Sequence, residues 1–207
     1  MFTRLLGHPG VVETVELRSR FGFMAFHGGS LELVTDTIAE RAAEAAGASV
    51  YVVAQPPEFR WHVPSNRIDP AESEALAAFC AHVDVAVAVH GYGRRRIPTT
   101  LLVGGTNRAL ARHVSGHLRA RLDDYVVTDD LDQIPRALRG VHPDNPVNRP
   151  RHGGAQLELP PRVRGLGPHW HDHGPGLVPP TRALIDGLAA AADAWPSSAE
   201  RTADALE

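Results

Sequence analysis

FGFMAFHGGSLELVTDTIAERAAEAAGASVYVVAQ, residues 21–55, joins two apolar, β-rich runs through an alanine-rich segment. The runs 21–27 and 49–55 are short, apolar and typical of β-strands. The segment 31–47 between them has the periodicity of an amphipathic helix and ends at a glycine, a residue that commonly closes helices. This order predicts a strand, a helix and a second, parallel strand, which together form one βαβ unit.

The same alternation of strands and helices continues along the rest of the chain. It predicts further helices at 70–82, 107–122, 131–140 and 180–195, and further strands at 83–91, 99–105, 125–130 and 155–160. Residues 142–154 are rich in proline, glycine and asparagine and are expected to form a loop. We therefore predict an α/β fold in which helices flank a mostly parallel mixed sheet. Residues 1–196 are expected to form a single domain, followed by a polar tail at 197–207.

The composition is that of an ordinary globular protein, with 43% apolar residues, 22% charged residues and a net charge of -3. All 21 basic residues are arginines and they are scattered, so a nucleic-acid partner is not expected. No apolar run reaches the roughly 20 residues of a membrane span, and the N-terminus does not resemble a signal peptide. The single cysteine, Cys80, lies in an apolar helical pattern, which predicts a buried thiol and no disulfide. We expect a cytoplasmic protein without a membrane partner.

Two predicted strands end in a histidine that is followed at once by glycine. His27 begins the sequence HGG, and His90 begins the sequence HGYG. Ligands gather at the carboxyl ends of parallel strands, and glycine lets the backbone turn there, so both imidazoles are expected at one edge of the sheet. Glu158 has a similar position, on a strand that precedes two prolines. Glu32 is expected in the first turn of the helix after His27, where a carboxylate interacts favourably with the helix dipole.

Two histidines and one carboxylate form the ligand set of a catalytic zinc site that leaves a fourth position for water. A separate carboxylate can then act as general base, so these residues predict metal-assisted hydrolysis with Glu158 accepting the proton. Each residue also has a structural interpretation. A histidine at a strand end is commonly a hydrogen-bonded edge residue, Glu32 can be a helix-terminal charge, and Glu158 can be a solvated residue of an edge strand. Their occurrence together favours the metal site.

The segments HGGSLE, SNR, VAVHG and GGAQLELPPRVR occur in this order within residues 21–164, about two thirds of the chain. In this order they resemble the poly-gamma-glutamate hydrolase family of zinc carboxypeptidase-like amidohydrolases. The resemblance implies a zinc carboxypeptidase-like fold in which His27, Glu32 and His90 bind Zn²⁺. It also implies that Glu158 activates a water molecule and then protonates the leaving amine.

The resemblance further implies a small-molecule or peptide substrate with a glutamyl-type amide bond and a carboxylate that arginine would hold through paired hydrogen bonds. The predicted substrate-binding residues are Asn66, Arg67, Arg162 and Arg164. The first two stand where zinc carboxypeptidases carry a substrate-binding Asn-Arg pair, and the last two match arginines of the family just after the strand of Glu158. Asn148 and Arg149, in the loop before that strand, form a reserve pair.

The stretch HWHDH, residues 169–173, places three histidines at alternate positions in a glycine- and proline-rich loop. In an extended segment His169, His171 and His173 would share one face and could bind a metal adventitiously, although exposed loop histidines are the simpler interpretation. Three alternatives stay open beside a hydrolase of gamma-glutamyl amide bonds. They are a deacylase of N-acyl amino acids, a non-catalytic metal-binding protein, and a metal-storage or pH-responsive histidine surface. The sequence does not predict the oligomeric state.

Overall fold

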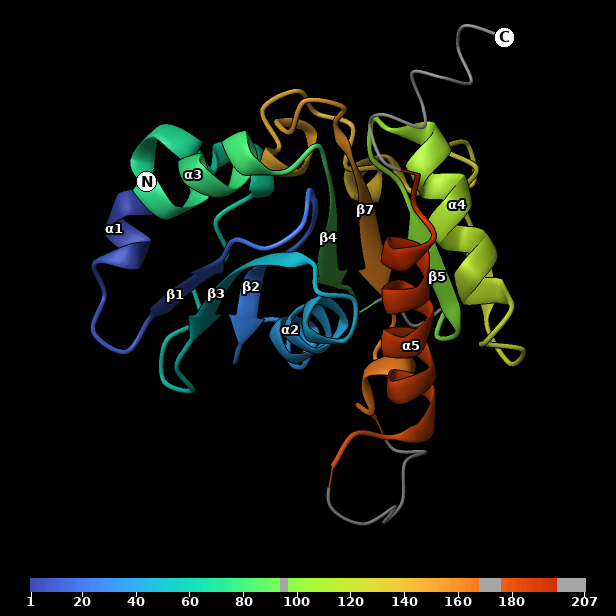
Figure 1. The fold of residues 1–207 in the computed structure, drawn as a ribbon. Helices are drawn as coiled ribbons and strands as arrows, with labels where there is room; N and C mark the ends of the chain where they lie inside the picture. The colour runs from blue at the N-terminus through green and yellow to red at the C-terminus, as the bar shows by residue number, and fades with distance from the viewer. Residues whose placement is uncertain (94–96, 168–175, 197–207) are drawn as a thin grey trace, which may run out of the picture.

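A seven-stranded mixed sheet forms the centre of the protein in a computed structural model that describes residues 1–93, 97–167 and 176–196 (Figure 1). The strands lie in the order β1-β3-β2-β4-β7-β5-β6. Their bounds are Val12–Glu16 (β1), Phe21–Gly29 (β2), Ser49–Gln55 (β3), Val85–Gly91 (β4), Thr100–Val103 (β5), Val126–Thr128 (β6) and Gly154–Leu159 (β7). The stretch HWHDH and the polar tail lie outside the described residues.

The four central strands β3, β2, β4 and β7 run parallel to one another. The strands β5 and β6 are also parallel to each other, whereas β1 joins β3 and β5 joins β7 in antiparallel fashion. The predicted mostly parallel mixed sheet is therefore confirmed. Parallel strands covered on both faces consist largely of apolar residues, which is why the sequence pattern identified β2, β3 and β4.

Helices cover both faces of the sheet, as predicted. On the face toward the viewer in Figure 1 lie α2 (Thr35–Ala45), α4 (Arg108–Arg119) and α5 (Pro179–Asp193), and on the other lie α1 (Phe2–Leu6) and α3 (Glu74–His82). Successive side chains of β2 point to opposite faces of the sheet, so they pack against different helices. Phe23 packs in the same core as Ile38 of α2, whereas Met24 packs in the same core as Phe79 of α3.

The turn that follows β2 corrects one prediction. α2 begins at Thr35, because residues 31–34 form a turn in which the Glu32 amide donates a hydrogen bond to the His27 carbonyl oxygen at 2.7 Å. Glu32 therefore precedes the helix, and the acidic residue of the first helical turn is Asp36. The turn still brings Glu32 back toward His27, which is the arrangement that the metal-site prediction requires.

The predicted helix at 131–140 is also wrong. This segment forms turns and a short 3₁₀ helix, η3 (Arg136–Leu138), because Pro135 has no N–H group and disfavours helical backbone in the residue before it. The short α1 and the largely exposed edge strand β1 were not predicted. The remaining 3₁₀ helices are η1 (Ser65–Arg67), η2 (Pro70–Glu72), η4 (Pro146–Asn148) and η5 (Arg162–Arg164).

The two glycines after His27 are required by the backbone geometry. Gly29 has a φ of 66°, and a Cβ atom there would collide with the backbone of Gln55 on β3. A Cβ atom on Gly28 would lie 2.6 Å from the Cβ atom of Asp36. The Asp36 carboxylate in turn accepts a hydrogen bond from the Gly29 amide at 2.8 Å. These contacts hold α2 close to the end of β2.

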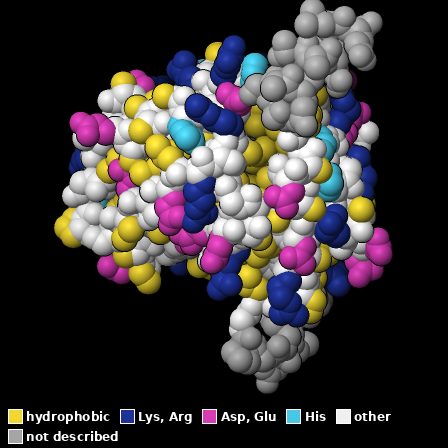
Figure 2. Space-filling view, viewed as in Figure 1, with side chains coloured by type: hydrophobic (Ala, Val, Ile, Leu, Met, Phe, Trp, Pro, Cys, Tyr) yellow, Lys and Arg dark blue, Asp and Glu magenta, His cyan; other side chains and the backbone are white. Residues whose placement is uncertain are grey.

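Other features of the described residues bear on the compositional predictions. None of the helices in the described ranges is long and apolar enough to cross a bilayer. Figure 2 shows arginine and acidic side chains interspersed over one face of the molecule. Cys80 is a free, partly buried thiol, and burial raises its pKa to about 12.

Candidate active site

The carboxyl ends of three adjacent parallel strands bring His27, His90 and Glu158 to one edge of the sheet. His27 belongs to β2, His90 to β4 and Glu158 to β7. His90 and Glu158 are paired in register, so their side chains leave the same face of the sheet. The exposed fractions of the three residues are only 1%, 3% and 4%. Buried ionisable groups that gather at strand ends are typical of functional sites.

The Glu32 carboxylate lies between the two histidines. Its Oε1 atom is 2.9 Å from His27 Nδ1, and its Oε2 atom is 3.4 Å from His90 Nδ1. Oε2 also accepts a hydrogen bond from the Gly91 amide at 2.8 Å. Burial opposes ionisation of Glu32, but the hydrogen bonds with His27 and His90 outweigh it and hold the pKa of Glu32 well below its usual range. The carboxylate is therefore ionised at neutral pH.

The backbone fixes the tautomer of His27. Its Nε2 atom lies 2.8 Å from the Val63 carbonyl oxygen, to which the imidazole must donate. In a neutral imidazole, Nδ1 is then an acceptor that faces the ionised Glu32 oxygen. Two acceptors at this distance require a second imidazole proton or a cation between them. A bound cation would satisfy both groups.

The residues present fit a zinc ion on chemical grounds. Imidazole nitrogens and a carboxylate oxygen are common zinc ligands, and a histidine that donates its other N–H to a backbone carbonyl is the usual arrangement around such an ion. His90 also has unused capacity, because its Nε2 atom is buried and has no hydrogen-bond partner within the described residues.

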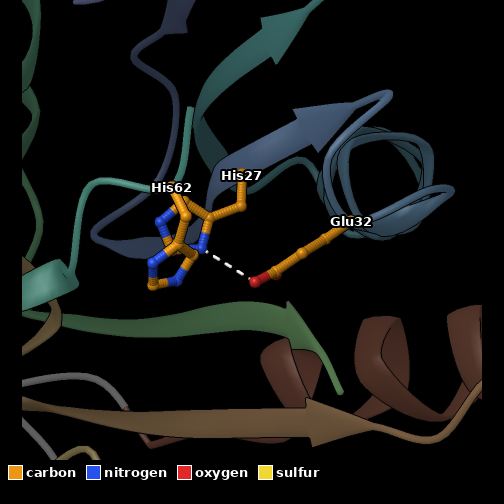
Figure 3. A group of neighbouring side chains, drawn as sticks. All are labelled: His27, Glu32 and His62. Atoms are coloured by element: carbon orange, nitrogen blue, oxygen red, sulfur yellow. Dashed lines mark hydrogen bonds and ion pairs between the residues drawn. The ribbon is translucent and has the colours of Figure 1, made fainter. Parts of the chain in front are cut away.

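A third histidine, His62, joins this cluster and was not predicted from the sequence. Figure 3 shows His62 beside His27, with Glu32 approaching from the side of α2. Ligand atoms of these three residues all lie within 4.8 Å of one another, and the ring centroids of His27 and His62 are 4.5 Å apart. Partial burial and the neighbouring His27 lower the pKa of His62. His62 lies in the irregular segment after β3, where no strand-end pattern could mark it.

Glu158 differs from Glu32 in its surroundings. It is buried and accepts a hydrogen bond from Gln156 Nε2 at 2.8 Å. Burial raises the pKa of Glu158 to about 7, although the nearby His90 opposes the shift. A carboxyl group with a pKa close to neutrality can accept and return a proton under physiological conditions.

Arg164 is buried and connects two parts of the site. Its guanidinium donates hydrogen bonds to the carbonyl oxygens of Leu33 at 3.0 Å and Tyr92 at 3.3 Å. Leu33 follows Glu32 directly, and Tyr92 follows the end of β4. Arg164 therefore ties the turn that carries Glu32 to the strand that carries His90, and it is not among the residues that line the cleft.

The cluster opens into a cleft with a volume of about 700 Å³. Residues 136–142, which were not predicted to belong to the site, form part of the wall of this cleft. This segment is held in place by hydrogen bonds from the Gly105 amide to the Arg139 carbonyl at 2.7 Å and from Asn148 Nδ2 to the Gly140 carbonyl at 2.8 Å. Arg136 lines the cleft, and its guanidinium forms no hydrogen bond or ion pair with any described residue.

The other predicted substrate-binding residues lie at different places. Asn66 lines the cleft, and Arg67 lines a neighbouring hollow that shares Asn66 with it. Arg162 is exposed and does not line the cleft. The reserve pair Asn148 and Arg149 is engaged in hydrogen bonds of its own. The structure thus brings together the three predicted ligands, Glu158 and Asn66, but not the predicted arginines.

Comparisons with solved structures agree with this architecture. A structure described as that of a bacteriophage poly-gamma-glutamate hydrolase aligns with a TM-score of 0.70 at 21% identity, covering 96% of this chain and 91% of that one. A zinc-free structure named YNDL-apo aligns with a TM-score of 0.71 at 16% identity, covering 88% and 89%. The Atu2144 gene product of Agrobacterium tumefaciens aligns with a TM-score of 0.51 at 14% identity, covering 100% and 98%. These similarities establish a shared fold.

A search of curated protein sequences finds no match to this chain. The model of the family described as poly-gamma-glutamate hydrolase, in contrast, matches residues 7–166, which is well over half of the chain. The match contains the whole cluster of His27, Glu32, His62 and His90, and it includes Glu158. The resemblance found in the sequence segments is thereby confirmed. The chain belongs to the poly-gamma-glutamate hydrolase family, a family of hydrolases that act on amide bonds.

Proposed function

We propose that the protein is a zinc-dependent amidohydrolase that cleaves a gamma-glutamyl amide bond. One arrangement carries the proposal: the ionised Glu32 lies between Nδ1 of His27 and Nδ1 of His90, and Glu158, with a pKa of about 7, lies in the same cleft. Family membership supports the gamma-glutamyl part of the proposal.

His27, Glu32 and His90 would hold the zinc ion, which when bound supplies a Lewis acid that polarises a carbonyl group and lowers the pKa of water. The surrounding chain orients these ligands. Val63 fixes the tautomer of His27 through its carbonyl oxygen, and the Gly91 amide holds one oxygen of Glu32. Such supporting hydrogen bonds typically matter for metal affinity nearly as much as the ligands do.

Glu158 would perform the proton transfers. Its carboxylate accepts a proton from water while the water oxygen bonds to the amide carbon and the carbonyl electron pair moves to the oxygen. The protonated Glu158 then donates this proton to the amide nitrogen as the C–N bond breaks and the carbonyl double bond forms again. The products are a carboxylic acid and an amine, and Glu158 returns to its starting state.

We further propose that Arg136 binds the substrate carboxylate. Arg136 combines a place in the wall of the cleft with a guanidinium that no described side chain neutralises. The predicted Arg164 is buried and committed to two carbonyl oxygens, and the predicted Arg162 is outside the cleft. Arg67 faces the adjoining hollow, so it would meet a substrate that extends past Asn66.

Elemental analysis of purified protein tests the metal site. We expect one zinc per chain in the wild type and in a His152→Ala control, which replaces an exposed histidine outside the cluster. We expect zinc to be lost in the His27→Ala and His90→Ala variants. Zinc retained in both variants would contradict the proposed ligands.

Hydrolysis assays then test the reaction and separate the alternatives. The zinc-loaded wild type should cleave oligomers of gamma-linked glutamate, whereas Glu158→Gln should keep its zinc and lose turnover. Preferential cleavage of N-acyl amino acids would indicate the deacylase instead. Zinc binding with no hydrolysis of either substrate class would indicate a non-catalytic metal-binding protein.

A further inference from the structure

His62 has a polar side chain that the rest of the described protein does not use. It lines the cleft, and its imidazole forms no hydrogen bond or ion pair with any described residue. It nevertheless stands at the metal cluster, next to the ring of His27 (Figure 3). An imidazole placed there is available to a ligand in the cleft.

The backbone on both sides of His62 is held in place. The side chain of Gln55, at the end of β3, accepts a hydrogen bond from the Trp61 amide at 2.7 Å and donates one to the Trp61 carbonyl oxygen at 3.0 Å. On the other side, the buried Val63 accepts the hydrogen bond from His27 Nε2 at 2.8 Å. The segment is therefore fixed to the sheet and to a predicted metal ligand. This double attachment fixes where the backbone of His62 lies relative to the cluster.

The order of the strands places His62 and Glu158 on opposite flanks of the cluster. Along the sheet the order is β3, β2, β4 and β7. His62 follows β3 and contacts His27 of β2, whereas Glu158 belongs to β7 and is paired with His90 of β4. An amide carbonyl at the centre of the cluster would thus have the proton-accepting group on one flank and an unpaired imidazole on the other.

We propose that His62 is a further catalytic residue, which donates a hydrogen bond from its imidazole N–H to the carbonyl oxygen of the substrate as that oxygen gains negative charge. This inference rests on the proposed amide hydrolysis. The proton remains on His62 throughout, so no bond to His62 forms or breaks. Donors aimed at a developing oxyanion commonly contribute on the order of 10² to 10³ in kcat. His62 is not assigned as a fourth zinc ligand, because a catalytic zinc site keeps its fourth position open.

The test compares His62→Ala, His62→Gln and the His152→Ala control as full-length, zinc-loaded proteins. We expect His62→Ala to lower kcat about 100-fold on a gamma-glutamyl oligomer while KM changes by less than about threefold. His62→Gln, whose side-chain amide can still donate, should recover part of the loss. The control should match the wild type.

Two binding measurements supply readouts that do not depend on turnover. Competition with a chelator should give the same zinc affinity for the wild type and both His62 variants. Calorimetry with a phosphinic analogue of the gamma-glutamyl bond, which imitates the tetrahedral oxyanion, should show about 100-fold weaker binding to His62→Ala. Binding of the hydrolysis product should change little.

Two other results for the His62 variants would overturn the inference. A large loss of zinc affinity in His62→Ala would make His62 a ligand, and unchanged kcat and analogue binding would make it a surface residue. Either result leaves wild-type amide hydrolysis, and thus the proposed function, standing. If the wild type cleaves no amide bond, whether or not it binds zinc, the proposed function and this inference are both overturned.

Discussion

Replacing Glu158 with glutamine tests the buried carboxyl group through the stability of the zinc-free protein. Burial raises the pKa of Glu158 from an ordinary 4.5 to about 7. In the unfolded chain the group ionises above about pH 4.5, whereas in the folded protein it stays protonated until about pH 7. The free energy of unfolding therefore falls as pH rises through this window, because the unfolded state releases the proton first. At about 1.36 kcal/mol per pKa unit, the complete penalty above pH 7 is about 3 kcal/mol.

The Glu158→Gln variant does not bear this penalty, and its amide can still pair with Gln156. We expect the stabilisation of the variant over the wild type to be about 2–3 kcal/mol larger at pH 8 than at pH 5. Urea titrations of chelator-treated protein measure the difference. The control Glu58→Gln removes an exposed loop carboxylate and should change stability little at either pH. An effect of Glu158→Gln that is the same at both pH values would refute the reasoning, since only a shifted carboxyl pKa produces the pH dependence.

Two further substitutions test the substrate contact and the packing of the site. In steady-state assays, Arg136→Gln should raise KM for a carboxylate-bearing substrate about tenfold or more with little change in kcat, because it removes a charge-assisted hydrogen bond. If Arg162→Gln raised KM equally, Arg136 would have no specific role in substrate binding. Gly91→Ala should lower the free energy of unfolding by about 1–3 kcal/mol, since the new Cβ atom would lie 2.6 Å from guanidinium atoms of Arg164 and would push them away from the carbonyl oxygens to which they donate. Gly93→Ala, where a Cβ atom would meet no atom of the described residues within 4 Å, should be close to neutral in the same denaturation experiment.

The sequence predicted the centre of the fold better than its edges, for a physical reason. Strands buried on both faces must be apolar throughout, so β2 and β4 could be identified directly. The edge strand β1 is largely exposed and has no such constraint. The predicted helix at 131–140 was wrong because Pro135 interrupts the helical periodicity of this segment.

The residues of the candidate site also differ in how far the sequence could predict them. His27, His90 and Glu158 could be predicted because each stands at the end of an apolar run, where a buried polar residue is unusual. His62 lies on an irregular segment and Arg136 begins the short 3₁₀ helix η3, and the positions of both depend on contacts distant in sequence. The hydrogen bond from His27 Nε2 to the Val63 carbonyl oxygen holds the first segment, and the hydrogen bond from the Gly105 amide to the Arg139 carbonyl oxygen holds the second. No local pattern in a single sequence records such contacts.

The contrast between the two carboxyl groups argues for catalysis over metal binding alone. Glu32 faces two histidines and accepts a hydrogen bond from the Gly91 amide, so its pKa is lowered and it stays charged, as a metal ligand must. Glu158 is buried with one side-chain hydrogen bond, so its pKa is raised to about 7. A site that only stored a cation would need the first group alone, and burying a second carboxyl beside it would cost stability without improving binding. When the surroundings of two carboxyl groups in one cleft shift their pKa values in opposite directions, one group can stay charged and stabilise positive charge while the other transfers protons.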